Sequence, residues 1–271
     1  MTTTVNPPEH QTGIAIPARG AGPFRSIALF TGRSVRHDLR DPEAMLMAIG
    51  LPVMLMVLFT FVFGGAIAPG GDYIDYVVPG IVLLCSGFGA ASTAVTVSRD
   101  LRTGTLNRLR TMPIPAATVL AGHTLASLAR NLLATAVVLV VGVLLGFRPE
   151  AGPLEWVATV ALVALWILAM TSLFAVIGLV AGSPEAANGY GFVLLFLPYV
   201  SSAFVPVDTM PGWLQGFATH QPVTPMIEAV RGLLTGAEVG SAGLVAVLWC
   251  LGITAVAALS GARLFRRAVT R

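Results

Sequence analysis

Long apolar runs that carry almost no charge are the feature of this sequence that most limits its fold. A membrane-spanning helix needs about 20 mostly apolar residues, and several runs of that length occur in the chain. Only 11% of its 271 residues are charged, whereas a soluble domain carries about 25%. The pattern favours an all-α integral membrane protein over a very apolar soluble one. Six membrane-spanning helices are expected, at residues 44–64, 77–98, 117–147, 154–181, 187–207 and 241–263.

The distribution of arginine predicts the orientation of these spans. All sixteen basic residues are arginine. With the N-terminus inside, Arg148 and Arg231 fall outside, Arg130 falls within a span near its inner end, and the others fall inside. Because basic residues concentrate in cytoplasmic loops, both termini are expected in the cytoplasm of a bacterial cell, with the spans in its plasma membrane. Residues 1–22 are polar, without the apolar core of a signal peptide, and are expected to form a disordered cytoplasmic tail.

Residues 23–41, PFRSIALFTGRSVRHDLRD, have the pattern of a helix that lies in the inner membrane surface. On a helix, the arginines fall within one narrow arc, opposite an apolar side. They are Arg25, Arg33, Arg36 and Arg40. Such a face suits anionic headgroups or a cytoplasmic partner, and a merely solvated segment is the alternative.

The segment 98–115, SRDLRTGTLNRLRTMPIP, is expected to face the cytoplasm. On a helix, one face would collect Leu101, Thr105, Leu109 and Met112, with Arg108 and Arg110 at its flanks. Gly104 weakens a helix and Pro113 ends one, so a short helix is expected between them. An apolar seam with arginine edges suits a groove with acidic rims. In the alternative, the arginines only fix the topology.

Residues 205–236 are expected to lie outside, yet they are strongly apolar. Proline divides them into short helical pieces, and a solvated loop would not carry their apolar patches. These patches favour re-entrant or interface-lying helices, with packing against neighbouring spans as the alternative. The residues concerned are Pro211, Trp213, Leu214, Phe217, Pro222 and Pro225, followed by Ile227, Val230, Leu233 and Leu234.

Several kinds of chemistry are excluded or disfavoured by the residues present. Without lysine the chain can hold neither a phosphate-binding loop nor a Schiff base. Cys85, Cys250 and the four histidines have no metal-ligand spacing, so no catalytic, cofactor or metal site is expected. A channel or secondary carrier remains an alternative function, although acids lie only at the ends of spans or between them. A membrane-embedded enzyme is a poorer alternative.

Three stretches carry a resemblance to a known family. They are DLRTGTLNRLRTMPIPAATVLAGHTLASLARNLL with its GVLLGFRP exit, FVPVDTMPGWLQGFATHQPVTPMIEAVRGLL, and YVVPGI at 76–81. The chain resembles a permease subunit of the type-2 ABC exporter family, near its daunorubicin-resistance branch. The resemblance covers nearly all of the chain beyond residue 23. His123 and Ser127 depart from that branch, where arginine and an acid are common.

The resemblance implies six spans and a paired assembly. Two permeases, identical or homologous, would sit on two copies of a cytoplasmic ATPase, which would hold ATP and Mg. The first cytoplasmic loop would form a coupling helix that docks on the ATPase, and the element before the last span would form an outer gate. The coupling residues would be Asp100, Leu101, Arg102, Gly104, Thr105, Leu106, Arg108, Leu109, Arg110, Met112 and Pro113.

These expectations together describe an exporter of a hydrophobic or amphipathic compound, such as a drug, an antibiotic or a lipid, with no nucleic-acid partner. The path would lie between the paired permeases, along the second and fifth spans. Its candidate residues are Phe88, Phe192, Phe196, Tyr199, Ser201 and Ser202. Ordinary helix packing by the same side chains is the alternative.

Overall fold

The computed structural model describes residues 42–67, 73–102 and 116–269, and all regular structure in them is helical. The first membrane-crossing unit is α2 (Pro42–Val57), continued by the π-helical turn η1 (Leu58–Phe63) and α3 (Gly64–Ile67). Three long helices follow, α4 (Tyr73–Arg102), α6 (Ala116–Leu145) and α7 (Pro153–Val180). The rest of the chain forms α8 (Pro184–Leu194), η2 (Leu197–Val200), η3 (Val207–Thr209), α9 (Gly212–His220), α10 (Val223–Thr235) and α11 (Ala242–Val269).

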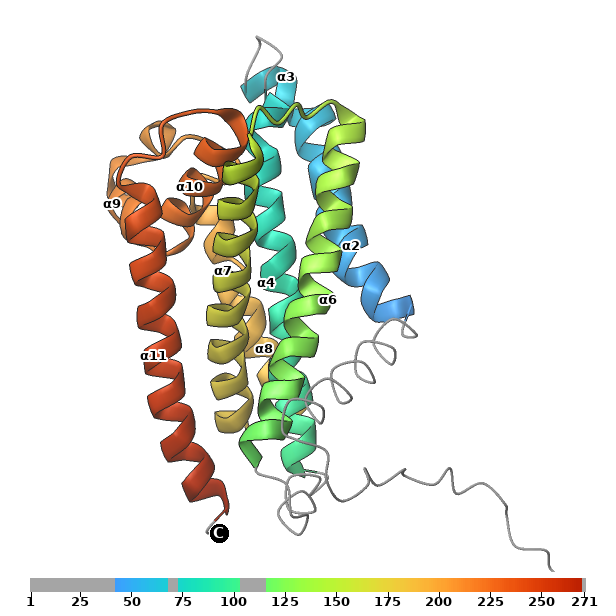
Figure 1. Ribbon diagram of the computed structural model, residues 1–271, viewed down its shortest axis with the longest axis vertical. Helices are drawn as coiled ribbons and strands as arrows, with labels where there is room; N and C mark the ends of the chain where they lie inside the picture. Colours follow the sequence, from blue (N-terminus) through green and yellow to red (C-terminus); the bar gives the residue numbers. More distant parts are fainter. Residues whose placement is uncertain (1–41, 68–72, 103–115, 270–271) are drawn as a thin grey trace, which may run out of the picture.

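Five helices of the described chain are long and apolar enough to cross a membrane, namely 48–67, 73–99, 127–145, 153–180 and 242–261. They correspond to five of the six expected spans and confirm a multi-span helical protein. Helix α4 lies at the centre, where it packs against α2, α6, α7, α8 and α10. Helices α9 and α10 lie together at one end of the bundle (Figure 1). That end is called the α10 end below.

The expected span at 187–207 is not one helix, and this part of the prediction is wrong. Helix α8 ends at Leu194, a short 3-10 turn follows, and Ser201 is extended. Pro198 explains the break, because it has no N–H and its ring clashes with the carbonyl four residues earlier, which is that of Leu194. Residues 195–206, which connect α8 to η3, are called the broken segment below.

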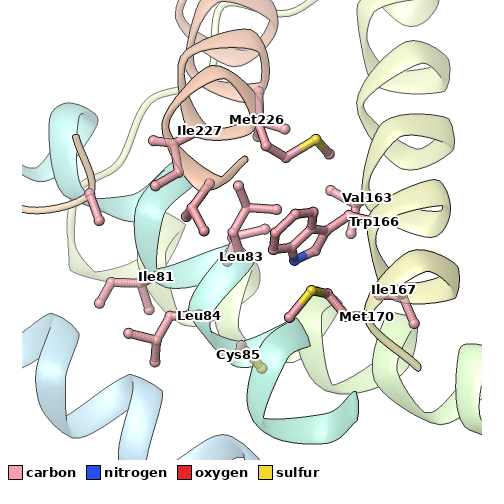
Figure 2. Close-up of a cluster of buried hydrophobic side chains, with 14 of the residues drawn as sticks. Ile81, Leu83, Leu84, Cys85, Val163, Trp166, Ile167, Met170, Met226 and Ile227 are labelled. Carbon is pink, nitrogen blue, oxygen red and sulfur yellow. The ribbon is translucent and has the colours of Figure 1, made fainter. Parts of the chain in front are cut away.

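Large apolar side chains fix α10 to the bundle. Met226 and Ile227 of α10 meet Leu83 of α4 and Trp166 of α7 in one buried cluster (Figure 2). Trp166 is 2% exposed, and Met226 and Ile227 are fully buried. The α10 patch predicted from the sequence is therefore part of the core of the chain. Close packing of these side chains holds α10 against the bundle.

Candidate functional site

Helix α10 owes its position to an amphipathic pattern with proline at its start and glycine at its end. Pro222 precedes the helix and Pro225 lies in its first turn, where a missing N–H costs nothing. Gly236 ends the helix with φ 70°, a left-handed conformation that favours glycine. Between them, one face of α10 is buried against α4, α7 and α11. The helix therefore presents its inward-facing polar side chains to the neighbouring backbone.

Arg231 is the polar centre of this contact. Its Nε and Nη2 donate to the carbonyl oxygen of Tyr76 at 3.1 and 3.0 Å, and Nη2 also donates to that of Ser202 at 2.6 Å. The guanidinium carbon lies 3.7 Å from the centre of the Tyr76 ring, which is a cation–π distance. One side chain of α10 thus joins α4 to the broken segment.

Two ionisable groups of α10 are partly desolvated, namely Arg231, which is half-buried, and Glu228, which is more exposed. Burial lowers the pKa of Arg231, while Tyr76 and Glu228 act in the opposite direction. Burial raises the pKa of Glu228, and the charge of Arg231 partly offsets this. The unperturbed pKa of arginine is so high that Arg231 stays charged at neutral pH. The carbonyl dipoles and the Tyr76 ring therefore surround a positive charge.

Gln221 and Tyr73 bind other carbonyls of the broken segment. The amide nitrogen of Gln221 donates to the carbonyl oxygens of Leu197 at 3.1 Å and Val200 at 2.8 Å. The hydroxyl of Tyr73, at the start of α4, donates to the carbonyl oxygen of Phe204 at 2.8 Å. A helix that stops leaves its last carbonyls unpaired, and in a membrane these must find partners within the protein. Tyr73 of α4 and Gln221, which directly follows α9, supply them.

Six aromatic rings form a continuous series, called the aromatic row below. Adjacent ring centres lie 5.1, 5.9, 5.3, 4.1 and 5.4 Å apart. Four of these distances fall in the usual range of ring pairs, and the fourth pair in the series is closer. In order, the rings are those of Phe192, Phe196, Tyr199, Phe204, Phe59 and Phe63. Phe192 is 59% exposed and Phe196 53%, whereas Phe204 is 4% exposed. The row therefore begins on the surface at α8 and passes through a buried ring to η1.

The structure brings together only part of the predicted path. Phe192, Phe196 and Tyr199 lie in one row. Phe88 is half-buried and packs on the core. Ser201 and Ser202 are buried in the broken segment, where the Ser201 hydroxyl donates to the carbonyl oxygen of Pro198. These two serines do not reach a surface that a transported molecule could touch.

Three members of the aromatic row were not predicted, namely Phe59, Phe63 and Phe204. Phe59 and Phe63 are four residues apart, which places them on one helix face. This spacing is common in long apolar helices and is therefore a weak signal. Phe204 joins them to α8 only through the fold of the broken segment. Its position could not be obtained from spacing alone.

The predicted gate residues divide between two different environments. Trp213 and Phe217 lie one turn apart on α9 and are 82% and 54% exposed, while Leu214 is half-buried. Pro211 directly precedes α9, and Pro222 directly precedes α10. Helix α9 thus turns its large side chains away from the chain, and α10 buries its own.

The opposite end of the bundle holds part of the predicted coupling segment. Asp100, Leu101 and Arg102 form the last turn of α4, where Leu101 is half-buried and Arg102 exposed. The remaining coupling residues, from Gly104 to Pro113, lie outside the described residues, as does the helix expected at 23–41. Nearby, Nη2 of Arg130 on α6 donates to the Ser92 hydroxyl of α4 at 3.0 Å.

Comparison with known proteins identifies the class to which this fold belongs. Residues 25–235 match the model of the ABC-2 type transporter family. The chain is 31% identical to the daunorubicin resistance ABC transporter permease protein DrrB1 of Streptomyces coeruleorubidus, over 76% of this chain and 77% of that protein. It is 32% identical to the probable doxorubicin resistance ABC transporter permease protein DrrC of Mycobacterium tuberculosis, over 89% and 88%. It is also 27% identical to the Escherichia coli inner membrane transport permease YadH, over 66% and 72%.

The chain therefore belongs to the ABC-2 type transporter family. It is the membrane permease subunit of an ABC exporter, a multi-pass membrane protein that works with an ABC ATPase partner. Its role in that complex is transport, not catalysis.

Proposed function

We propose that this permease exports a hydrophobic or amphipathic compound, and that the aromatic row forms part of the path. The observation that carries the proposal is the exposed beginning of the row, where Phe192, Phe196 and Tyr199 offer ring faces beside a broken span. Aromatic side chains supply large apolar contact areas, and broken helices in transporters mark binding regions. The relatives named for daunorubicin and doxorubicin resistance support a drug or antibiotic as cargo; a lipid is a further possibility of the same chemistry.

The assembly we propose has two permease subunits and two ATPase subunits. ATP and Mg bind to the ATPase alone, because this chain has no lysine for a phosphate-binding loop. Arginine asymmetry supports cytoplasmic termini in a bacterial plasma membrane, so the α10 end faces out and the end of α4 faces the ATPase. The segment around Leu109 acts as the coupling helix, and α9 with α10 acts as the outer gate.

The path is tested with the complete complex in inverted membrane vesicles. ATP-dependent uptake is measured for a panel of hydrophobic compounds that includes doxorubicin. We expect Phe196→Ala to reduce uptake several-fold for at least one compound, because it removes the middle exposed ring of the row.

Trp249→Ala is the matched control. Trp249 is an aromatic residue of α11 that is 41% exposed and lies outside the row, so its loss should leave uptake near that of the unchanged protein. Equal uptake by the two variants for every compound would show that the row only packs.

A further inference from the structure

We propose that Gln221 and Arg231 are positioning residues that set the conformation of the broken segment and thereby orient Tyr199 in the aromatic row. Neither residue touches the exposed rings. Each acts on the backbone that carries them. The significance of this for transport rests on the proposed function, but the positioning itself can be measured separately.

The argument begins with the backbone groups of the broken segment. Residues that leave a helix lose the regular N–H partners of their carbonyls, and each buried unpaired carbonyl costs about 1–3 kcal/mol. Gln221 reaches the carbonyls of Leu197 and Val200, which are three residues apart, and so occupies the place of two helix hydrogen bonds. Tyr199 lies between these two residues. Its backbone is therefore held on both sides by one amide group.

Arg231 holds the next part of the segment. It donates to the carbonyl of Ser202 at 2.6 Å and to that of Tyr76 through two nitrogens. Because Tyr76 belongs to the central helix α4, this contact fixes the segment relative to the bundle and not only to α10. Hydrogen bonds from a charged donor are roughly twice as strong as neutral ones.

The held backbone determines where the rings lie. The ring of Tyr199 is stacked on that of Phe204, with centres 5.3 Å apart and planes 18° apart. Phe204 is in turn fixed through its carbonyl by the Tyr73 hydroxyl. The contacts of Gln221 and Arg231 thus hold the part of the row between the exposed rings of Phe192 and Phe196 and the buried ring of Phe204. Freeing the backbone would let Tyr199 leave its stacked position.

The donor geometry makes both residues hard to replace. Lysine keeps the charge of Arg231, but it lacks the second nitrogen, Nε, that also donates to the Tyr76 carbonyl, and it lacks the planar group that lies over the Tyr76 ring. Glutamate keeps the shape of Gln221, but its carboxylate offers acceptors where two donors are needed. Arg231→Lys and Gln221→Glu are therefore specific tests of hydrogen bonding, with little change in size.

The chain contains a matched control for each variant. Arg148 donates through Nη1 to the carbonyls of Val143 and Phe147 at the end of α6, so Arg148→Lys removes a similar arginine contact away from the row. Gln215 donates through its amide to the carbonyls of Asp208 and Met210, so Gln215→Glu disrupts the same type of double contact on α9.

The first measurement reports on the position of residue 199 and does not depend on transport. Tyr199→Cys is introduced into the complex in a background without Cys85 and Cys250, and its rate of reaction with N-ethylmaleimide is measured in membranes. Loss of one charge-assisted contact shifts the equilibrium between held and released backbone about tenfold. We expect roughly tenfold faster labelling with Arg231→Lys or Gln221→Glu, and unchanged labelling with Arg148→Lys or Gln215→Glu.

The second measurement is the ratio of ATP-dependent uptake for two compounds of different size, with Tyr199 intact. We expect Arg231→Lys to change this ratio and the two controls to leave it unchanged. Faster labelling with an unchanged ratio supports the positioning role and contradicts the aromatic row as the path. Unchanged labelling overturns the positioning role, whatever happens to uptake.

Assembly is checked by recovery of the ATPase with the permease. If Arg231→Lys prevents assembly, Tyr73→Phe replaces it, because it removes one hydroxyl donor to the carbonyl of Phe204 and keeps the ring. Labelling of Tyr199→Cys should then rise in the Tyr73→Phe protein. Gln221→Glu then carries the test of the proposal itself, and an unchanged labelling rate in that protein contradicts it.

Discussion

Gly80→Ala should destabilise the permease at the contact between α4 and the broken segment. A Cβ atom at position 80 would lie 2.8 Å from both the Cα and the carbonyl oxygen of Ala203. That is about 0.6 Å short of the 3.4 Å at which ordinary contact begins. Both atoms belong to backbone, so no side chain can rotate away and α4 must separate from the segment. Overpacking of this kind costs about 1–3 kcal/mol.

Gly87→Ala on the same helix isolates that cost. Its new Cβ would meet the side chain of Leu195 at 3.5 Å, which is ordinary contact. Replacement of glycine by alanine within a helix gains about 0.8–1 kcal/mol from helix propensity, and this gain is the same in both variants. The difference between them therefore reports the steric term alone.

The assay is thermal unfolding of the purified complex at one fixed scan rate, because membrane complexes often unfold irreversibly. At about 2–4 °C per kcal/mol for chains of this size, the midpoint of Gly80→Ala should lie below that of Gly87→Ala by at least about 2 °C. Equal midpoints would show that α4 and residue 203 do not approach each other this closely. The effect should extend to transport, because Ala203 lies between Ser202 and Phe204, whose carbonyls fix the broken segment.

Four further predictions concern orientation, energy supply, gating and coupling. In intact cells and a cysteine-free background, an impermeant thiol reagent should label Gly70→Cys and Gln215→Cys but not Gly104→Cys; labelling of Gly104→Cys would overturn the orientation. The purified chain without its partner should neither bind nor hydrolyse ATP, as measured after removal of contaminating ATPases. Trp213→Ala should lower export at normal membrane levels, and unchanged export would make α9 only a packed helix. Leu109→Asp keeps every arginine, so insertion should be normal while ATPase capture and export are lost; normal capture would exclude a coupling role.

The sequence predicted the long helices well because their limits are marked by local chemistry. Helix α7 occupies 153–180 against an expected 154–181, since Pro153 starts it and Ser183 with Pro184 begins the next helix. The run at 187–207 had the same composition but not the same structure. Its apolar residues are numerous enough to meet the length criterion for a membrane span. Pro198 breaks the helix there only if nearby side chains can donate hydrogen bonds to the carbonyls that lose their helical partners.

Those side chains lie in α4, in α10 and at Gln221 just after α9. They are far from the broken segment in sequence, so the sequence does not show that they meet it. In the sequence analysis, Gln221, Thr224 and Arg231 appear only within the stretch FVPVDTMPGWLQGFATHQPVTPMIEAVRGLL that resembles the family. Arg231 was also one of the two arginines expected outside. In the structure, Thr224 accepts from the Ser202 amide and donates to the carbonyl of Ala218, beside the contacts of the other two. The polar side chains of that stretch thus hydrogen-bond to the backbone of the broken segment.

This arrangement also explains why an apolar element contains a half-buried arginine. A charge buried without partners is strongly unfavourable. Two carbonyls and a ring lie directly against Arg231, and the charge of Glu228 also favours its ionised form. A carboxylate would form a stronger pair, but it would leave the carbonyls of Tyr76 and Ser202 without this donor. The broken segment therefore requires a hydrogen-bond donor at position 231, and arginine supplies it. Because the same segment carries Tyr199, a requirement of backbone hydrogen bonding becomes a requirement on the surface where we propose that cargo passes.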